Sequence, residues 1–131
     1  MHALETFKPE EQELLRQAVD VICSVAQQHG VDVVRIYLFG SRARGGAGKD
    51  SDWDFYVVID KEVGFLQRQQ MGSLIRRFLA KQKIDCDVLI QAEETVCRRR
   101  SDTGYLTYYV LKEGVPVYER RYGEKLDAQS R

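Results

Sequence analysis

The fold of this chain is decided by the stretch LFGSRARG, residues 38–45, and by SDWD, which follows at residues 51–54. The first motif ends an apolar run over residues 31–39, which predicts a buried strand. Gly40 lacks a Cβ, so the backbone can turn sharply there and approach a ligand closely. If a helix opens next, its N–H groups and the two arginine side chains form a site for phosphate. The candidate phosphate contacts are therefore Gly40, Ser41, Arg42 and Arg44.

Two carboxylates form the second motif. Asp52 and Asp54 run into FYVVI at residues 55–59, which is rich in aromatic and β-branched residues and predicts a strand. Because successive side chains of a strand alternate between its faces, both acids point the same way and Trp53 points to the other side. Two carboxylates a pleat apart can share Mg²⁺, a hard cation that keeps several waters and is usually held together with substrate phosphates.

A third acid is available in the segment IDCDVLI, residues 84–90, which alternates like another strand. Asp85 and Asp87 share one of its faces. If this strand pairs beside the first acid strand, one of the two completes a cluster of three carboxylates. Such a cluster with bound metal can neutralise phosphate charge, lower the pKa of an attacking hydroxyl and align an in-line displacement. The alternation by itself does not choose between Asp85 and Asp87.

Together the motifs resemble the signature of the polymerase β-type nucleotidyltransferase superfamily, and the GSRARG version is similar to its minimal nucleotidyltransferase (MNT) branch. The resemblance covers residues 30–120, including the acid before the apolar run at residues 87–90. It implies an α+β, palm-like nucleotidyltransferase fold with a small mixed β-sheet covered by helices. We expect one domain over residues 1–122, followed by a polar tail at residues 123–131 that frays.

The resemblance also implies a role for each motif residue. Gly40 and Ser41 contact the nucleotide triphosphate, and Asp52 and Asp54 are the shared Mg²⁺ ligands. Asp87 is the third carboxylate of the metal site and the base that activates the acceptor. Members of this superfamily transfer a nucleoside monophosphate from a triphosphate, here expected to be AMP from ATP, to an acceptor and release pyrophosphate. Several MNT proteins resemble antitoxins that adenylylate a HEPN-type toxin, which makes such a protein the expected acceptor.

Other functions stay open on the sequence. A non-catalytic antitoxin could bind nucleotide as a structural ligand and inhibit its partner by occlusion, although the complete set of acids argues against it. Within the enzyme class, small molecules such as aminoglycosides and the ends of RNA are the alternative acceptors. Because few residues remain for a helical region that grips an acceptor, we expect a partner protein or a second copy of the chain to complete that side.

Composition narrows the class of protein. Lys+Arg and Asp+Glu both total 20 in 131 residues, so the net charge does not favour nucleic acid as a partner. No Walker-type loop or dinucleotide fingerprint fits the glycine-rich segment after Arg44. There is no secretory signal and no apolar run near the length that spans a bilayer. Three cysteines without metal-ligand spacing indicate reduced thiols, so the expected location is the cytoplasm, away from membranes.

Periodicity predicts the scaffold of the site. Pro9 fits the first turn of a helix that runs to about His29, with Gly30 as its stop. Helical spacing predicts a second helix over residues 65–81 and a third over residues 105–111, before a short strand at residues 115–118. The expected core residues of the first two helices are Leu14, Leu15, Ala18, Ile22, Val25, Ala26, Met71, Leu74, Ile75, Phe78 and Leu79.

Overall fold

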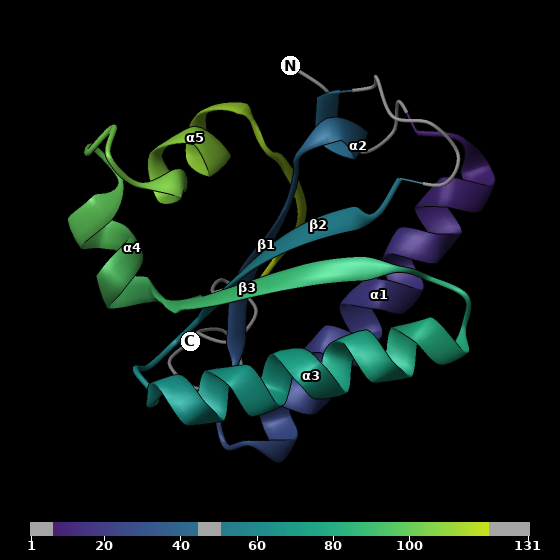
Figure 1. The fold of residues 1–131 in the computed structure, drawn as a ribbon, viewed down its shortest axis with the longest axis horizontal. Coiled ribbons are helices and arrows are strands. Elements are labelled where there is room, and N and C mark those ends of the chain that lie inside the picture. Colours follow the sequence, from purple (N-terminus) through teal and green to yellow (C-terminus); the bar gives the residue numbers. More distant parts are fainter. Residues whose placement is uncertain (1–6, 45–50, 121–131) are drawn as a thin grey trace, which may run out of the picture.

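A four-stranded sheet packed between two groups of helices forms the core of the computed structural model, which describes residues 7–44 and 51–120 (Figure 1). The strands are β1 (Val33–Phe39), β2 (Trp53–Ile59), β3 (Cys86–Ala92) and β4 (Val115–Glu119). They lie in the order β3-β2-β1-β4. β1 is antiparallel to both β2 and β4, whereas β2 and β3 are parallel. The predicted α+β fold with a small mixed sheet is therefore confirmed; the predicted frayed tail at residues 123–131 lies outside the described residues.

The described residues form five helices, whose bounds are α1 (Pro9–Gln28), α2 (Ser41–Arg44), α3 (Phe65–Lys81), α4 (Glu93–Arg99) and α5 (Leu106–Glu113). α1 and α3 lie side by side against one face of the sheet, and α4 and α5 cover the other (Figure 1). Across the described ranges, no helix has the length and apolar character that a membrane span requires.

The first helix forms where its start and stop signals predict. Pro9 occupies its first turn, and the backbone N–H of Lys8 donates to Oε1 of Glu11 at 3.0 Å, which holds the N-terminus. Gly30 follows the C-terminus at φ +79°, a left-handed conformation that glycine adopts without strain. Of the expected core residues of α1, Leu14 is half-buried and the rest are buried: Leu15, Ala18, Ile22, Val25 and Ala26.

The second predicted helix is α3, with the expected bounds, but the prediction that Phe78 belongs to its core is wrong. Met71, Ile75 and Leu79 are buried, whereas Phe78 is 37% exposed and lies with its ring 5.8 Å from Nζ of Lys81. Phe78 therefore sits at the edge of the apolar stripe, where its ring can be half-covered by a lysine stem.

The C-terminal part differs in one element. The predicted third helix is α5, which begins at Leu106, but α4 was not predicted because its seven residues are too short to show a helical period. Two of its side chains, Thr95 and Val96, are buried. Val96 helps to form a second core, between the helix pair α4–α5 and the sheet, with Val34, Tyr56, Val58 and Val110.

Candidate functional site

The predicted phosphate turn lies where β1 ends. Gly40 follows Phe39 with φ +78°, and α2 begins at the next residue. The carbonyl of Gly40 accepts the backbone N–H groups of Ala43 and Arg44 at 3.1 and 3.3 Å, which closes the first turn of α2. The Gly40 Cα faces the second motif so closely that a Cβ there would lie 2.2 Å from Oδ2 of Asp54. The turn therefore packs directly against Asp54, and any side chain at residue 40 would displace that carboxylate.

The strand register brings the acids together. Asp54 of β2 is the direct partner of Asp87 on the parallel neighbour β3, and Phe39 at the end of β1 is its partner on the other side. Asp52 comes one residue before β2. Because strand side chains alternate, Asp54 shares the face of Tyr56, which is the face covered by α4 and α5. The site is thus at the end of this face, beside the phosphate turn.

The charges of the other two acids act on Asp54. Burial raises the pKa of Asp54, and the negative charges of Asp87 and Asp52 raise it further, whereas Arg44 lowers it. Asp54 is half-buried, while Asp52 and Asp87 are exposed. A cation bound here would relieve the repulsion between the carboxylates.

The donor set fits a hard divalent cation bound together with phosphate. In the described ranges, no three His, Cys, Asp or Glu side chains lie close enough to one another to make a complete metal cage by themselves. Mg²⁺ does not need one, because it keeps several waters and is usually held by one or two carboxylates plus substrate phosphates. The backbone of Gly40 packs directly against the Asp54 carboxylate, so the predicted phosphate turn and a predicted metal ligand are neighbours.

The position of Asp85 bears on the choice of the third acid. Asp85 precedes β3, and its backbone carbonyl accepts the N–H of Trp53 at 3.0 Å. Its neighbour Asp87 is in direct register with Asp54 and contributes to the raised pKa of that residue. The geometry therefore favours Asp87, and both assignments remain predictions about catalysis.

The two arginines of the first motif diverge. Arg44 is exposed, acts on the charge of Asp54 and lines a cavity with Gly40. Arg42 instead lies over the ring of Trp53, with its guanidinium carbon 4.2 Å from the ring centroid, and Trp53 is on the opposite face of β2 from Asp54. The Arg42 side chain therefore lies on the face of β2 away from Asp54, and its predicted contact with phosphate stays a prediction. One sequence signal for this contact was available. Trp53 faces away from the two acids, and its ring therefore has to pack against another side chain.

A cavity of about 110 Å³ adjoins the phosphate turn and brings in residues that the motifs did not identify. Its lining residues come from β1, α2, α5 and the ends of these elements: Phe39, Gly40, Ala43, Arg44, Leu106, Tyr109, Val110, Glu113 and Gly114. α5 is tied to the acid strand by the buried hydrogen bond between the hydroxyls of Tyr56 and Thr107, 2.5 Å long. α5 is therefore a wall of the cavity beside the turn.

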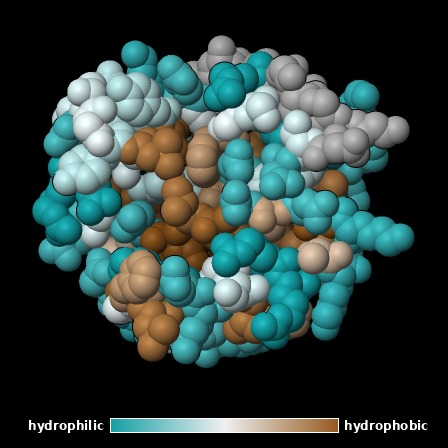
Figure 2. Space-filling view, viewed as in Figure 1, coloured by the Kyte–Doolittle hydropathy of each residue, from teal (hydrophilic) through white to brown (hydrophobic). Residues whose placement is uncertain are grey.

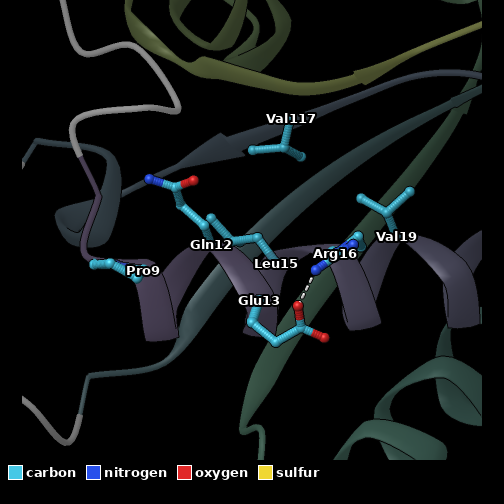
Figure 3. A pocket seen from close by; sticks show the side chains of 7 residues that line it. All are labelled: Pro9, Gln12, Glu13, Leu15, Arg16, Val19 and Val117. Carbon is cyan, nitrogen blue, oxygen red and sulfur yellow. Dashed lines mark hydrogen bonds and ion pairs between the residues drawn. The ribbon is translucent and has the colours of Figure 1, made fainter.

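A larger cavity, of about 470 Å³, lies between α1 and β4 (Figure 3). Its lining is Pro9, Gln12, Glu13, Leu15, Arg16, Val19 and Val117, with an ion pair between Glu13 and Arg16 at its rim. None of the predicted site residues lines it. Of the two cavities, only the smaller one is lined by predicted site residues, Gly40 and Arg44.

A phosphate turn packed against paired carboxylates on a mixed sheet defines a nucleotidyltransferase-type site. Residues 20–122 match the family described as Polymerase beta, Nucleotidyltransferase, and the chain belongs to this family. A solved structure provisionally described as a minimal nucleotidyltransferase is 30% identical, with 80% of this chain and 94% of that chain covered and a TM-score of 0.50. The resemblance to the minimal branch is thereby confirmed.

Other relatives extend the comparison. The protein adenylyltransferase MntA of Aphanizomenon flos-aquae (strain 2012/KM1/D3) is 28% identical over 96 residues, which is 70% of this chain. The chain spans 60% of the length of that curated relative.

Two solved structures share the fold at lower identity. One is a toxin–antitoxin with AMP-PNP, with 20% identity, 83% of this chain and 79% of that chain covered, and a TM-score of 0.53. The other is a Shewanella oneidensis tri-AMPylated HEPN toxin in complex with MNT antitoxin, at 18% identity, 87% and 80% coverage and a TM-score of 0.51. Both are similar to this chain in fold.

Proposed function

We propose that this protein transfers AMP from ATP to a partner protein, a HEPN-type toxin, and thereby acts as its antitoxin. The single observation that carries the proposal is the packing of Gly40 against Asp54, which joins a triphosphate-binding turn to the carboxylates that would hold its metal. The similarity to a protein adenylyltransferase and to a toxin–antitoxin with AMP-PNP supports AMP as the transferred group.

Each residue has a distinct task in the proposed reaction. The backbone at Gly40, the hydroxyl of Ser41 and the side chain of Arg44 bind the triphosphate, and Asp52 and Asp54 hold Mg²⁺. Mg²⁺ would supply neutralisation of the phosphate charge and a lower pKa for the attacking hydroxyl. Asp87 takes the proton of that hydroxyl. The hydroxyl oxygen then bonds to the α-phosphorus, the bond from this phosphorus to the α–β bridging oxygen breaks, and pyrophosphate leaves.

The surface beside the site supports a protein as the acceptor. Leu89, two residues beyond Asp87 on β3, is 43% exposed, and Leu106 of α5 is also 43% exposed. Figure 2 shows apolar side chains gathered on this face of the molecule. An apolar surface next to a charged site is typical of a docking surface for another macromolecule. A HEPN-type partner, as in the Shewanella complex, or a second copy of this chain would complete the acceptor side.

We place the reaction in the cytoplasm. The described cysteines, Cys23, Cys86 and Cys97, are all free thiols, as reducing compartments favour, and ATP is abundant there.

Transfer of label from α-labelled ATP tests the proposal. The chain is incubated with Mg²⁺ and three sets of acceptors: candidate HEPN-type proteins, aminoglycosides and RNA oligonucleotides. We expect label on a protein acceptor, and a loss of at least about 100-fold with Asp54→Asn, since the metal site is removed. Asp20→Asn, an exposed acid on α1, is the matched control and should transfer at the wild-type rate.

Each alternative has its own outcome. Label found only on an aminoglycoside or only on RNA would identify that molecule, and not a protein, as the acceptor. Equal neutralisation of the toxin by wild type and Asp54→Asn, without label, would show that the protein acts by occlusion. Transfer that persists in Asp54→Asn would reject the assigned site.

A further inference from the structure

Arg42 makes contacts that have no place in triphosphate binding. Its Nε and Nη2 both donate to the backbone carbonyl of Ser51, at 3.0 and 2.8 Å. Its guanidinium covers the ring of Trp53 at 4.2 Å, and its Nη1 lies 3.9 Å from Oε2 of Glu11 on α1. The side chain is 13% exposed, so these contacts are made largely away from water.

These contacts hold the Ser51 backbone and the Trp53 ring, one on each side of a predicted metal ligand. Ser51 and Trp53 are the residues directly before and after Asp52, and Trp53 is in turn directly before Asp54. The N–H of Trp53 also donates to the carbonyl of Asp85 at 3.0 Å, which joins the start of β2 to the start of β3. Arg42 thus connects the phosphate turn and α1 to the segment that presents both carboxylates.

The planar arginine side chain suits this task in a way that lysine does not. A guanidinium presents a rigid fork of donors and stacks on an aromatic face, whereas an ammonium is a compact point charge. Hydrogen bonds that a charged group donates are stronger than neutral ones, and a cation–π contact becomes stronger when it is removed from water. The arrangement is therefore strong enough to determine where residues 51–53 lie.

We propose that Arg42 is a positioning residue, which holds Ser51 and Trp53 so that Asp52 and Asp54 present their carboxylates to one divalent cation. This inference rests on the proposed function only for the assignment of the two carboxylates as metal ligands. Arg42 acts through the backbone of residues 51–53 and does not touch the nucleotide. Partners that orient metal ligands typically change metal affinity by about 10- to 100-fold when they are lost.

Mn²⁺ binding to the metal-free full chain, without nucleotide, is the direct test. Free Mn²⁺ is followed by electron paramagnetic resonance for wild type, Arg42→Lys and Arg16→Lys. Arg16 lies exposed on α1 and contacts Glu13, so it is a matched control for the same chemical change. We expect Arg42→Lys to weaken Mn²⁺ binding by about 10- to 100-fold and Arg16→Lys to leave it unchanged.

Trp53 gives a second readout, because it is the one tryptophan in the sequence. Its emission, excited selectively over the tyrosines, reports directly on the ring that Arg42 covers. Bound Mn²⁺ should quench this emission with the midpoint found by paramagnetic resonance, and the midpoint should move to higher concentration in Arg42→Lys. The binding of ATP in the presence of a chelator should stay within about twofold of wild type, because the turn at Gly40 and Ser41 is retained.

Kinetics separates positioning from direct contact. In Arg42→Lys, the Mg²⁺ concentration for half-maximal AMP transfer should rise by the same factor as the Mn²⁺ dissociation constant, while kcat at saturating Mg²⁺ recovers towards wild type. A change in Mn²⁺ affinity below about threefold would overturn the proposal. So would a loss of metal-free ATP affinity as large as the loss of Mn²⁺ affinity, which would make Arg42 a phosphate contact.

Two further outcomes are distinguishable. If Arg42→Lys does not fold, Trp53→Phe tests the same contact, because phenylalanine keeps an apolar ring but weakens cation–π stacking. Weaker Mn²⁺ binding by Trp53→Phe then supports the proposal, and unchanged binding overturns it.

The same measurements separate this proposal from the proposed function. A wild-type chain that binds Mn²⁺ but transfers no AMP refutes the proposed function alone. An Arg42→Lys variant that binds Mn²⁺ and transfers AMP like wild type refutes the positioning role alone.

Discussion

Replacing Gly40 with alanine forces a methyl group into the carboxylate of Asp54. The added Cβ would lie 2.2 Å from Oδ2 and 3.2 Å from Cγ of that residue. Real Cβ atoms essentially never approach other heavy atoms closer than 3.0 Å, so Oδ2 must move away by about 1 Å. Gly40 also has φ +78°, which alanine adopts only with strain.

Both effects have a predictable size. The left-handed backbone costs about 1–2 kcal/mol for alanine, which in a domain of this length lowers Tm by about 3–10 °C. A displacement of about 1 Å at a reacting centre can reduce the rate by about 100-fold. We therefore expect Gly40→Ala to remain folded, to lose about 100-fold or more in AMP transfer, and to bind Mn²⁺ more weakly.

Gly30 provides a matched control. It has nearly the same backbone angle, φ +79°, but a Cβ there would meet no atom within 4 Å. Gly30→Ala should therefore show the same backbone strain in thermal unfolding and keep wild-type transfer. The difference between the two variants isolates the contact with Asp54.

A double-mutant cycle measures that contact directly. In an Asp54→Ala background the remaining Cβ lies 3.5 Å from the new Cβ, which is an ordinary contact, so Gly40→Ala should cost only the backbone strain. Unfolding in urea gives the four stabilities. Equal costs in the two backgrounds, or a Gly40→Ala variant as active as Gly30→Ala, would refute the close approach of the turn to Asp54.

Three further predictions follow from burial. Burial and the charges of neighbouring carboxylates raise the pKa of Asp54, so the metal-free folded state loses stability as the pH rises above the unfolded pKa. Asp54→Asn should thus raise Tm at about pH 7 and leave it unchanged at about pH 3, where both states are protonated; a lower Tm at pH 7 would contradict this. Cys97 is exposed, whereas burial raises the pKa of Cys23 to about 11, so peptide mapping at pH 8 should find iodoacetamide on Cys97 well before Cys23; equal rates would count against the burial. Tyr56→Phe removes the hydrogen-bond partner of buried Thr107 and should cost about 1–3 kcal/mol in urea unfolding, and a cost near zero would argue against that bond.

Local patterns were sufficient for most of the fold. The first helix and α3 were predicted from apolar residues at helical spacing, β1 and β2 from apolar runs, and β3 from alternation, because these signals are set by neighbouring residues alone. α4 was not predicted because it is too short to show a helical period. Phe78 was wrongly placed in the core because the apolar stripe of a helix does not show which of its edge residues the sheet will cover. The site residues remain predictions. The pairing of Asp54 with Asp87 favours Asp87 over Asp85 as the third carboxylate.

The sequence by itself determined the class of chemistry, since Gly40-Ser41 and the two acids that follow are local arrangements of backbone and charge. Only the tertiary structure decided how these parts meet. The parallel pairing of β2 with β3 set Asp87 beside Asp54, and contacts with Ser51, Trp53 and Glu11 fixed the direction of the Arg42 side chain. Strand register and the direction of a long side chain depend on contacts between residues far apart in the chain, which no local pattern encodes.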